Sequence, residues 1–165
     1  MVVLKRLDDA LCDGDNIRAV IRNTGLNHDG KTAGITLPNR DSQEALIRSV
    51  YKRARIDPRD TPYIEAHGTG TAVGDVEELE AIQSAFEAGT NDELTTPLYV
   101  GTVKPNIGHL ESASGLAGFI KAVLMIENDM IPPNLNLETL KKTLKLDESR
   151  VTVSSAYQFY FFTRH

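Results

Sequence analysis

The order of the predicted elements indicates an α/β fold class. Segments with the period of a β-strand alternate along the chain with segments that have the period of an amphipathic helix. Glycine-rich turns follow two of the strands, as in sheets whose strand ends lead into helices. The chain has 165 residues, which is enough for one ordinary domain with a core of its own.

The start of the chain is predicted to contain two strands and a short helix. Residues 2–7, with the sequence VVLKRL, are predicted to form a strand. Residues 8–16 are expected to form a short helical turn that ends at Gly14. Residues 17–22 alternate apolar with charged side chains, which is the period of a second strand.

The next element is predicted to be an amphipathic helix. Asp41 and Glu44 stand three residues apart, as in a capping box, and indicate its start. Its buried stripe is expected to consist of Leu46, Ile47, Val50, Tyr51 and Ala54. The segment 56–62 should end the helix, because proline disfavours helical backbone at the residue before it.

The rest of the chain repeats the order of strand, loop and helix. Residues 63–67 and 98–103 are predicted strands, and Asp75 is expected to cap the helix between them. The inward face of that helix is predicted to be Leu79, Ile82 and Phe86. A third helix follows His109 and runs to about Asn128.

Composition and charge argue against several classes of function. The formal net charge of −5 does not favour non-specific binding of nucleic acid, which needs a basic surface. No run of 18 uncharged apolar residues occurs, so we expect no membrane span. The apolar run at the N-terminus is too short for a signal peptide, and the single cysteine, Cys12, cannot form a disulfide within the chain. We therefore expect a cytoplasmic location.

Two of the four histidines, His67 and His109, follow predicted strands and lie among small residues. Functional sites in α/β sheets form where strand ends lead into helices, so the two imidazole rings could converge. The residues alone leave a structural alternative open, in which both are core histidines satisfied by the backbone. His28, in a turn, and His165, at the terminus, are assigned no function.

The helix after His109 has almost no polar face. Between Ala113 and Ile126 only Ser114 and Lys121 are strongly polar, and a helix that is apolar nearly all round is buried on most sides. The N-terminus of a helix carries partial positive charge and unpaired N–H groups. A reacting group held there would meet a dry, electropositive environment that stabilises developing negative charge.

Three other kinds of site are indicated less strongly by the sequence. The loop 68–75 lacks the lysine and hydroxyl residue that end a P-loop. A metal site built from His67, His109, Asp75 and Glu78 is conceivable, but the chain has no HExxH-like pair. Cys12 is a poor nucleophile, because the neighbouring acidic residues disfavour a thiolate.

Two long motifs resemble those of a β-ketoacyl synthase. They are "EAHGTGTAVGDVEELEAI" and "VKPNIGHLESASGLAGFIKAVL", and "NHDGKTAGIT" matches the same domain. The resemblance is to the ketosynthase domain of type I polyketide synthases, including the fungal reducing kind. It implies a thiolase-like fold, of which this chain provides the C-terminal half and some lead-in, an incomplete αβαβα layered domain. Residues 1–153 would be the partial ketosynthase domain, and residues 154–165 an atypical tail, either truncated or mis-spliced.

The resemblance also implies a reaction and a set of site residues. The reaction is a decarboxylative Claisen condensation of malonyl-type units, carried by the phosphopantetheine arm of acyl carrier protein, with an enzyme-bound acyl thioester. The implied residues are catalytic His67, His109 and Lys104, substrate-binding Thr69, Thr71 and Asn106, and supporting Asp75 and Glu78, with no metal and no directly bound cofactor. A homodimer is expected of the full-length family.

The chain departs from the family pattern in two places. A nucleophilic cysteine motif such as TACSSS is absent, and so is the glycine-rich phenylalanine motif after the last strand. Without a thiolate no acyl-enzyme can form, so the chain alone is expected to be inactive. Without the missing N-terminal half, its apolar middle helix is expected to be exposed and to promote association. The alternatives are a ketosynthase of fatty acid synthesis, a catalytically dead binding partner and a metalloprotein.

Overall fold

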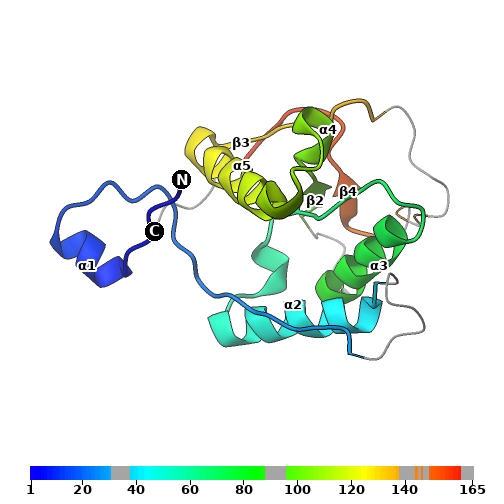
Figure 1. The fold of residues 1–165 in the computed structure, drawn as a ribbon, viewed down its shortest axis with the longest axis horizontal. Helices are drawn as coiled ribbons and strands as arrows, with labels where there is room; N and C mark the ends of the chain where they lie inside the picture. Colours follow the sequence, from blue (N-terminus) through cyan, green and yellow to red (C-terminus); the bar gives the residue numbers. More distant parts are fainter. Residues whose placement is uncertain (31–37, 88–95, 138–143, 145, 147–148, 161–165) are drawn as a thin grey trace.

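The computed structural model describes residues 1–30, 38–87, 96–137, 144, 146 and 149–160 (Figure 1). The helices are α1 (Leu7–Cys12), α2 (Arg40–Ala54), α3 (Gly74–Glu87), α4 (Lys104–Ile107) and α5 (Ser114–Asn128), with 3₁₀ turns η1 (Pro58–Asp60) and η2 (Glu111–Ala113). The strands are β1 (Tyr63–Glu65), β2 (Leu98–Gly101), β3 (Met130–Ile131), β4 (Val151–Val153) and β5 (Gln158–Phe159).

A parallel sheet of three strands forms the centre of the fold. The strand order is β1-β2-β4, with Tyr63 opposite Tyr99 and Leu98 opposite Val151. Parallel neighbours need a crossover, and α3 and α5 lie in the two connections. The predicted α/β class is therefore confirmed. Strands β3 and β5 form a separate antiparallel pair, which brings part of the predicted tail against the end of α5.

One face of the sheet is covered by α3 and, behind it, α2. The buried cluster consists of Ile82, Ala85 and Phe86 from α3 with Leu98, Val100 and Val151 from the strands. The Phe86 ring meets the Tyr51 ring of α2 edge-on, with centroids 5.1 Å apart. The predicted inward face of α3 is confirmed, since Leu79 also packs against this cluster. The predicted stripe of α2 is half-buried and reaches the core through Ile47 and Tyr51.

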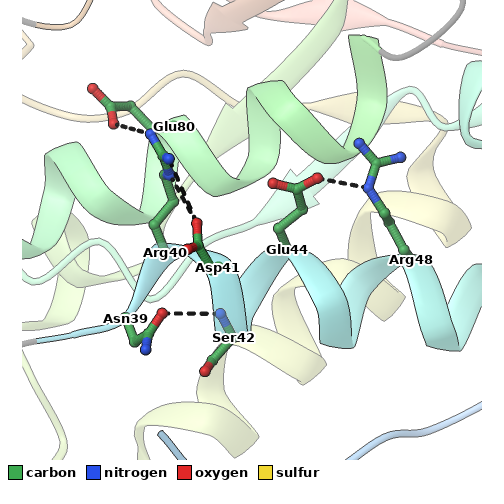
Figure 2. Close-up of polar contacts among 7 residues, drawn as sticks. All are labelled: Asn39, Arg40, Asp41, Ser42, Glu44, Arg48 and Glu80. Carbon is green, nitrogen blue, oxygen red and sulfur yellow. Dashed lines mark hydrogen bonds and ion pairs between the residues drawn. The ribbon is translucent and has the colours of Figure 1, made fainter. Parts of the chain in front are cut away.

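The start of α2 differs from the prediction (Figure 2). Asn39, not Asp41, is the N-cap, and its side-chain oxygen accepts a hydrogen bond from the Ser42 amide at 3.1 Å. An asparagine two residues earlier supplies the same acceptor as the expected aspartate. Asp41 lies in the first turn, where its negative charge favours the positive end of the helix. Arg40 reaches across to Glu80 of α3 at 3.1 Å.

The two strands predicted near the N-terminus do not form. Residues 1–6 and 15–30 have no regular secondary structure, and Val3 is 87% exposed. The alternating pattern is present, but a strand also needs a neighbour that pairs with its N–H and C=O groups. The short helix predicted between these segments is confirmed as α1, which lies apart from the body of the fold in Figure 1.

Helix α5 is only partly covered by the rest of the chain. Ser114, Gly118 and Met125 are buried. On another side, Leu116, Ile120 and Leu124 are 45%, 39% and 48% exposed, and their spacing of four residues places them in one row. The prediction that this helix is buried on most sides is wrong for this chain, and the expected exposure of its apolar side is confirmed. Within the described ranges, no helix has the length and hydropathy required to cross a bilayer.

Candidate active site

The structure brings His67 and His109 together. The two ring centroids are 5.6 Å apart, and the ring planes are nearly perpendicular. His67 lies two residues after β1, and His109 lies between α4 and η2, so the predicted convergence is confirmed. Both residues are exposed in this chain. The expected dry surroundings are therefore not formed by these residues alone.

Glycines shape the backbone next to both histidines. Gly68 has a φ of +46°, and a Cβ on it would lie 2.8 Å from the Thr102 Cγ2 atom. Gly108 has a φ of +76° and ends α4 with its N–H bonded to the Lys104 carbonyl at 2.8 Å. Only glycine adopts such angles without steric cost. These two turns direct the chain from the sheet edge to the histidines.

The two acidic residues of α3 hold the loop that carries His67. The Glu78 carboxylate accepts hydrogen bonds from the His67 amide at 2.6 Å and the Gly68 amide at 2.8 Å. Asp75 accepts one from the Gly70 amide at 3.0 Å. The prediction that Asp75 caps α3 is wrong, because the helix already begins at Gly74 and Asp75 lies in its first turn. Both carboxylates contact backbone amides.

Lys104 links α4 to the same loop. Its ammonium group donates a hydrogen bond to the His67 carbonyl oxygen and lies 3.5 Å from His67 Nδ1. An ammonium group has donors only, so a hydrogen bond between them requires Nδ1 as the acceptor. The ring proton of neutral His67 then resides on Nε2.

The hydrogen bonds around His109 indicate the same tautomer. The Glu111 amide donates to His109 Nδ1 at 3.0 Å, and the Ser114 hydroxyl lies 3.2 Å from the same atom. The Leu110 amide donates to that hydroxyl at 3.2 Å, which leaves its proton available for the ring. Since Nδ1 accepts, neutral His109 carries its proton on Nε2.

A cavity of about 360 Å³ lies beside His67, and His109 does not line it. Its lining includes His67 and Lys104 together with Glu65, Ser114 and Phe119. Asn106 does not line it but lines a second cavity of about 510 Å³ between α4 and α5. Thr69 and Thr71 lie in the loop before α3, with hydroxyl oxygens 3.4 Å apart. The Thr71 hydroxyl accepts a hydrogen bond at 3.1 Å from the amide of Gly74, which is the first residue of α3.

The sequence-based prediction missed a polar cluster between β1 and α5. The Glu65 carboxylate lies 2.9 Å from the Lys121 ammonium group and accepts hydrogen bonds from the Tyr63 hydroxyl at 2.5 Å and the Val103 amide at 2.6 Å. Burial raises the pKa of Tyr63, and the charge of Glu65 raises it further. The signal was Lys121 itself, the single charge in the otherwise apolar stretch 113–126.

The described part of the chain contains no group of three or more histidine, cysteine, aspartate or glutamate residues that could hold a metal ion. Cys12 is exposed, on α1.

Solved structures of ketosynthase domains share this fold. The ketosynthase from module 6 of the bacillaene synthase of Bacillus subtilis 168 superimposes with a TM-score of 0.89 at 38% identity, over 98% of this chain and 29% of that one. An oxazolomycin ketosynthase domain of Streptomyces albus JA3453 superimposes with a TM-score of 0.88 at 36% identity, over 94% of this chain and 27% of that one. The fold is therefore thiolase-like, and the chain has the architecture of part of a condensing enzyme.

The family follows from the sequence comparison. Residues 18–138 match the family described as beta-ketoacyl synthase, C-terminal domain, and the chain belongs to it. A reducing polyketide synthase of Cochliobolus heterostrophus is 53% identical over 158 residues, which is 96% of this chain and 6% of that protein. A highly reducing polyketide synthase of Talaromyces stipitatus is 54% identical over 153 residues, which is 92% of this chain and 6% of that protein. The chain thus spans a small part of the length of these relatives.

Proposed function

We propose that this chain is the C-terminal half of a ketosynthase domain of a reducing polyketide synthase and supplies the histidine pair for decarboxylative condensation. The observation that carries the proposal is the convergence of His67 and His109, 5.6 Å apart, within the family's motifs. The names of the curated relatives favour polyketide over fatty acid synthesis. A cytoplasmic location and the division at residue 153 remain predictions.

The proposed reaction places both imidazoles at one oxygen. Malonyl thioester on acyl carrier protein loses carbon dioxide, and the electron pair of the broken C–C bond passes into an enolate. The Nε2–H groups of His67 and His109 donate hydrogen bonds to the thioester oxygen as it becomes negative. The enolate carbon then attacks the acyl thioester on a cysteine, a new C–C bond forms, and the cysteine thiolate leaves.

Supporting roles follow from the contacts. Lys104 and Glu78 hold the backbone of His67 in place, and Asp75 holds Gly70. We propose that Thr69 and Thr71 contact the phosphopantetheine arm, which serves as substrate carrier. A substrate role for Asn106 stays a prediction, since its side chain lines the other cavity.

The nucleophile is proposed to come from outside these residues. Cys12, on α1, lies in no motif of the family's nucleophile kind. We expect the chain alone to form no acyl-enzyme and no product. Its proposed partners are the cysteine-bearing half of the domain, acyl carrier protein and, for the complete enzyme, a second copy.

The test uses the complete polypeptide that carries these residues. His67→Ala and His109→Ala are each expected to lower carbon dioxide release and elongation at least ~100-fold, as expected for loss of an oxyanion donor. Acyl loading of the cysteine should change little, because that step forms no malonyl enolate. His28→Ala, in the exposed turn, is the matched control. Wild-type elongation, measured by mass spectrometry, in His109→Ala would contradict the proposal.

A further inference from the structure

The carboxylate of Glu65 has hydrogen-bonding or ionic partners in three parts of the chain. Within its own strand it accepts the Tyr63 hydroxyl at 2.5 Å. From the connection between β2 and α4 it accepts the Val103 amide at 2.6 Å. From α5 it meets the Lys121 ammonium group at 2.9 Å, and that group also donates to the Tyr63 hydroxyl at 2.8 Å.

These contacts lie inside the protein. The side chains of Lys121 and Glu65 are only 13% and 12% exposed. Alternation along β1 turns Tyr63 and Glu65 toward α5, while Ile64 packs against the apolar cluster on the opposite face. The side chain of Glu65 fills the space over Gly118, where a Cβ would lie 2.9 Å from the Glu65 Cγ atom.

A buried ion pair is an expensive way to stabilise a fold. Removing two charges from water costs several kcal/mol per ion, and apolar side chains of similar volume are often as stable. Stability therefore does not account for this cluster. Its position offers another reason, because the segments that it joins lead to the residues of the proposed site.

Each of the three connected segments carries or contacts one of these residues. His67 follows Glu65 by two residues, and Lys104 follows Val103 directly. Helix α5, which carries Lys121, begins at Ser114, whose hydroxyl lies 3.2 Å from His109 Nδ1. One carboxylate thus sets the relative position of both histidines and the lysine, and it lines the same 360 Å³ cavity as His67 and Lys104.

We propose that Glu65 and Lys121 are positioning residues for the condensation step and that their ion pair holds His67, Lys104 and His109 in register. This inference rests on the proposed function. Neither residue touches the reacting atoms; both act through the backbone of the loops that carry the site.

The experiment compares Glu65→Gln, Lys121→Met and the double variant in the complete polypeptide. Each single variant is expected to lower kcat for elongation at least ~10-fold, the cost of a small displacement of a positioned group. The KM for malonyl-acyl carrier protein and the rate of acyl loading should stay within about threefold, since neither depends on enolate stabilisation. The double variant should lose less than the two single losses multiplied together, because it leaves no unpaired buried charge.

The matched control is a second ion pair on the same fold. Glu44 and Arg48 lie 2.7 Å apart at the partly exposed contact between α2 and α3, away from the proposed site, and Glu44→Gln should leave elongation within twofold of wild type. Elongation within twofold of wild type in both single variants of the buried pair would overturn the inference. So would an equal loss of loading and elongation, which is the result of damage to the whole fold.

A second readout does not depend on activity. Amide hydrogen exchange, followed by mass spectrometry, should be at least ~10-fold faster in residues 66–70 and 103–110 in Glu65→Gln, with no change in Glu44→Gln. Unchanged exchange there overturns the positioning role even if the wild-type polypeptide proves inactive. An inactive wild type with the expected exchange change contradicts the proposed function alone.

Discussion

The two faces of the parallel sheet are built in different ways. Helices α3 and α2 close one face with a continuous apolar cluster around Phe86 and Leu98. On the other face, α5 meets β1 through the polar cluster of Glu65 and Lys121, and its outer row of leucine and isoleucine faces water. The first face accounts for the stability of the fold, and the second carries the residues of the proposed site. The difference indicates that α5 is suited to packing between this sheet on one side and a second apolar layer on the other.

The largest expected difference between the faces is in core truncation. Phe86→Ala should lower the free energy of unfolding by about 3–5 kcal/mol, because the buried ring leaves a cavity. Leu124→Ala, on the outer row of α5, should cost about 1 kcal/mol or less, since that side chain is 48% exposed. Urea denaturation followed by circular dichroism measures both. Equal losses would show that the two faces do not differ as described.

The exposed row of α5 should also control association. We expect the chain to self-associate at micromolar concentration, and a variant with lysine at positions 116, 120 and 124 to be monomeric by light scattering. Lysine at positions 45 and 49, on the exposed side of α2, is the matched control and should change nothing. A wild-type monomer with a sharp cooperative thermal transition would argue against this expectation.

Two glycines of α5 distinguish its covered side from its open side. Gly118→Ala should destabilise the fold by about 1–3 kcal/mol, because the added methyl group would press on Glu65. Gly115→Ala meets no atom within 4 Å and should be neutral or stabilise by up to ~1 kcal/mol, since alanine favours a helix. Thermal denaturation of both variants gives the comparison. The prediction fails if Gly118→Ala is as stable as wild type.

The smallest expected effect is a difference between two tyrosines, one on each face. Burial raises the pKa of Tyr51, and burial together with the Glu65 charge raises that of Tyr63. The folded state therefore retains these phenolic protons above the ordinary pKa of about 10, so their contribution to stability is present below that pH and is lost as the pH rises beyond it. Glu65→Gln should lower the pKa of Tyr63 but not that of Tyr51. Tyrosinate absorbance, compared with Tyr63→Phe, measures the change; equal shifts in both tyrosines would refute the assignment.

Much of the fold and of the proposed site could be predicted from the sequence. The inward face of α3 followed from helical periodicity, because those side chains contact the core. The predicted end of α5 at about Asn128 is also confirmed. The convergence of His67 and His109 followed from their places after neighbouring strands. Local pattern was enough for contacts that helical periodicity or the order of the strands determines.

Two kinds of failure have a common physical cause, because the structure there depends on partners that the local sequence does not reveal. Residues 2–7 and 17–22 have strand patterns but no sheet neighbour among the described residues, so the pattern alone did not produce a strand. Glu65 was overlooked because its role depends on Lys121, which is distant in sequence and close only after folding. The Asn39 cap was missed for a smaller reason, since asparagine and aspartate two residues apart give similar signals.

The close approach at Gly118 connects two positions that are remote in the sequence. The glutamate at 65 occupies the volume that any larger residue at 118 would need. Among related chains these two positions should therefore vary together, with a bulky or acidic residue at one accompanied by a shorter side chain at the other. A recombination between two related sequences that replaced only one of these positions could place two incompatible side chains in the same space.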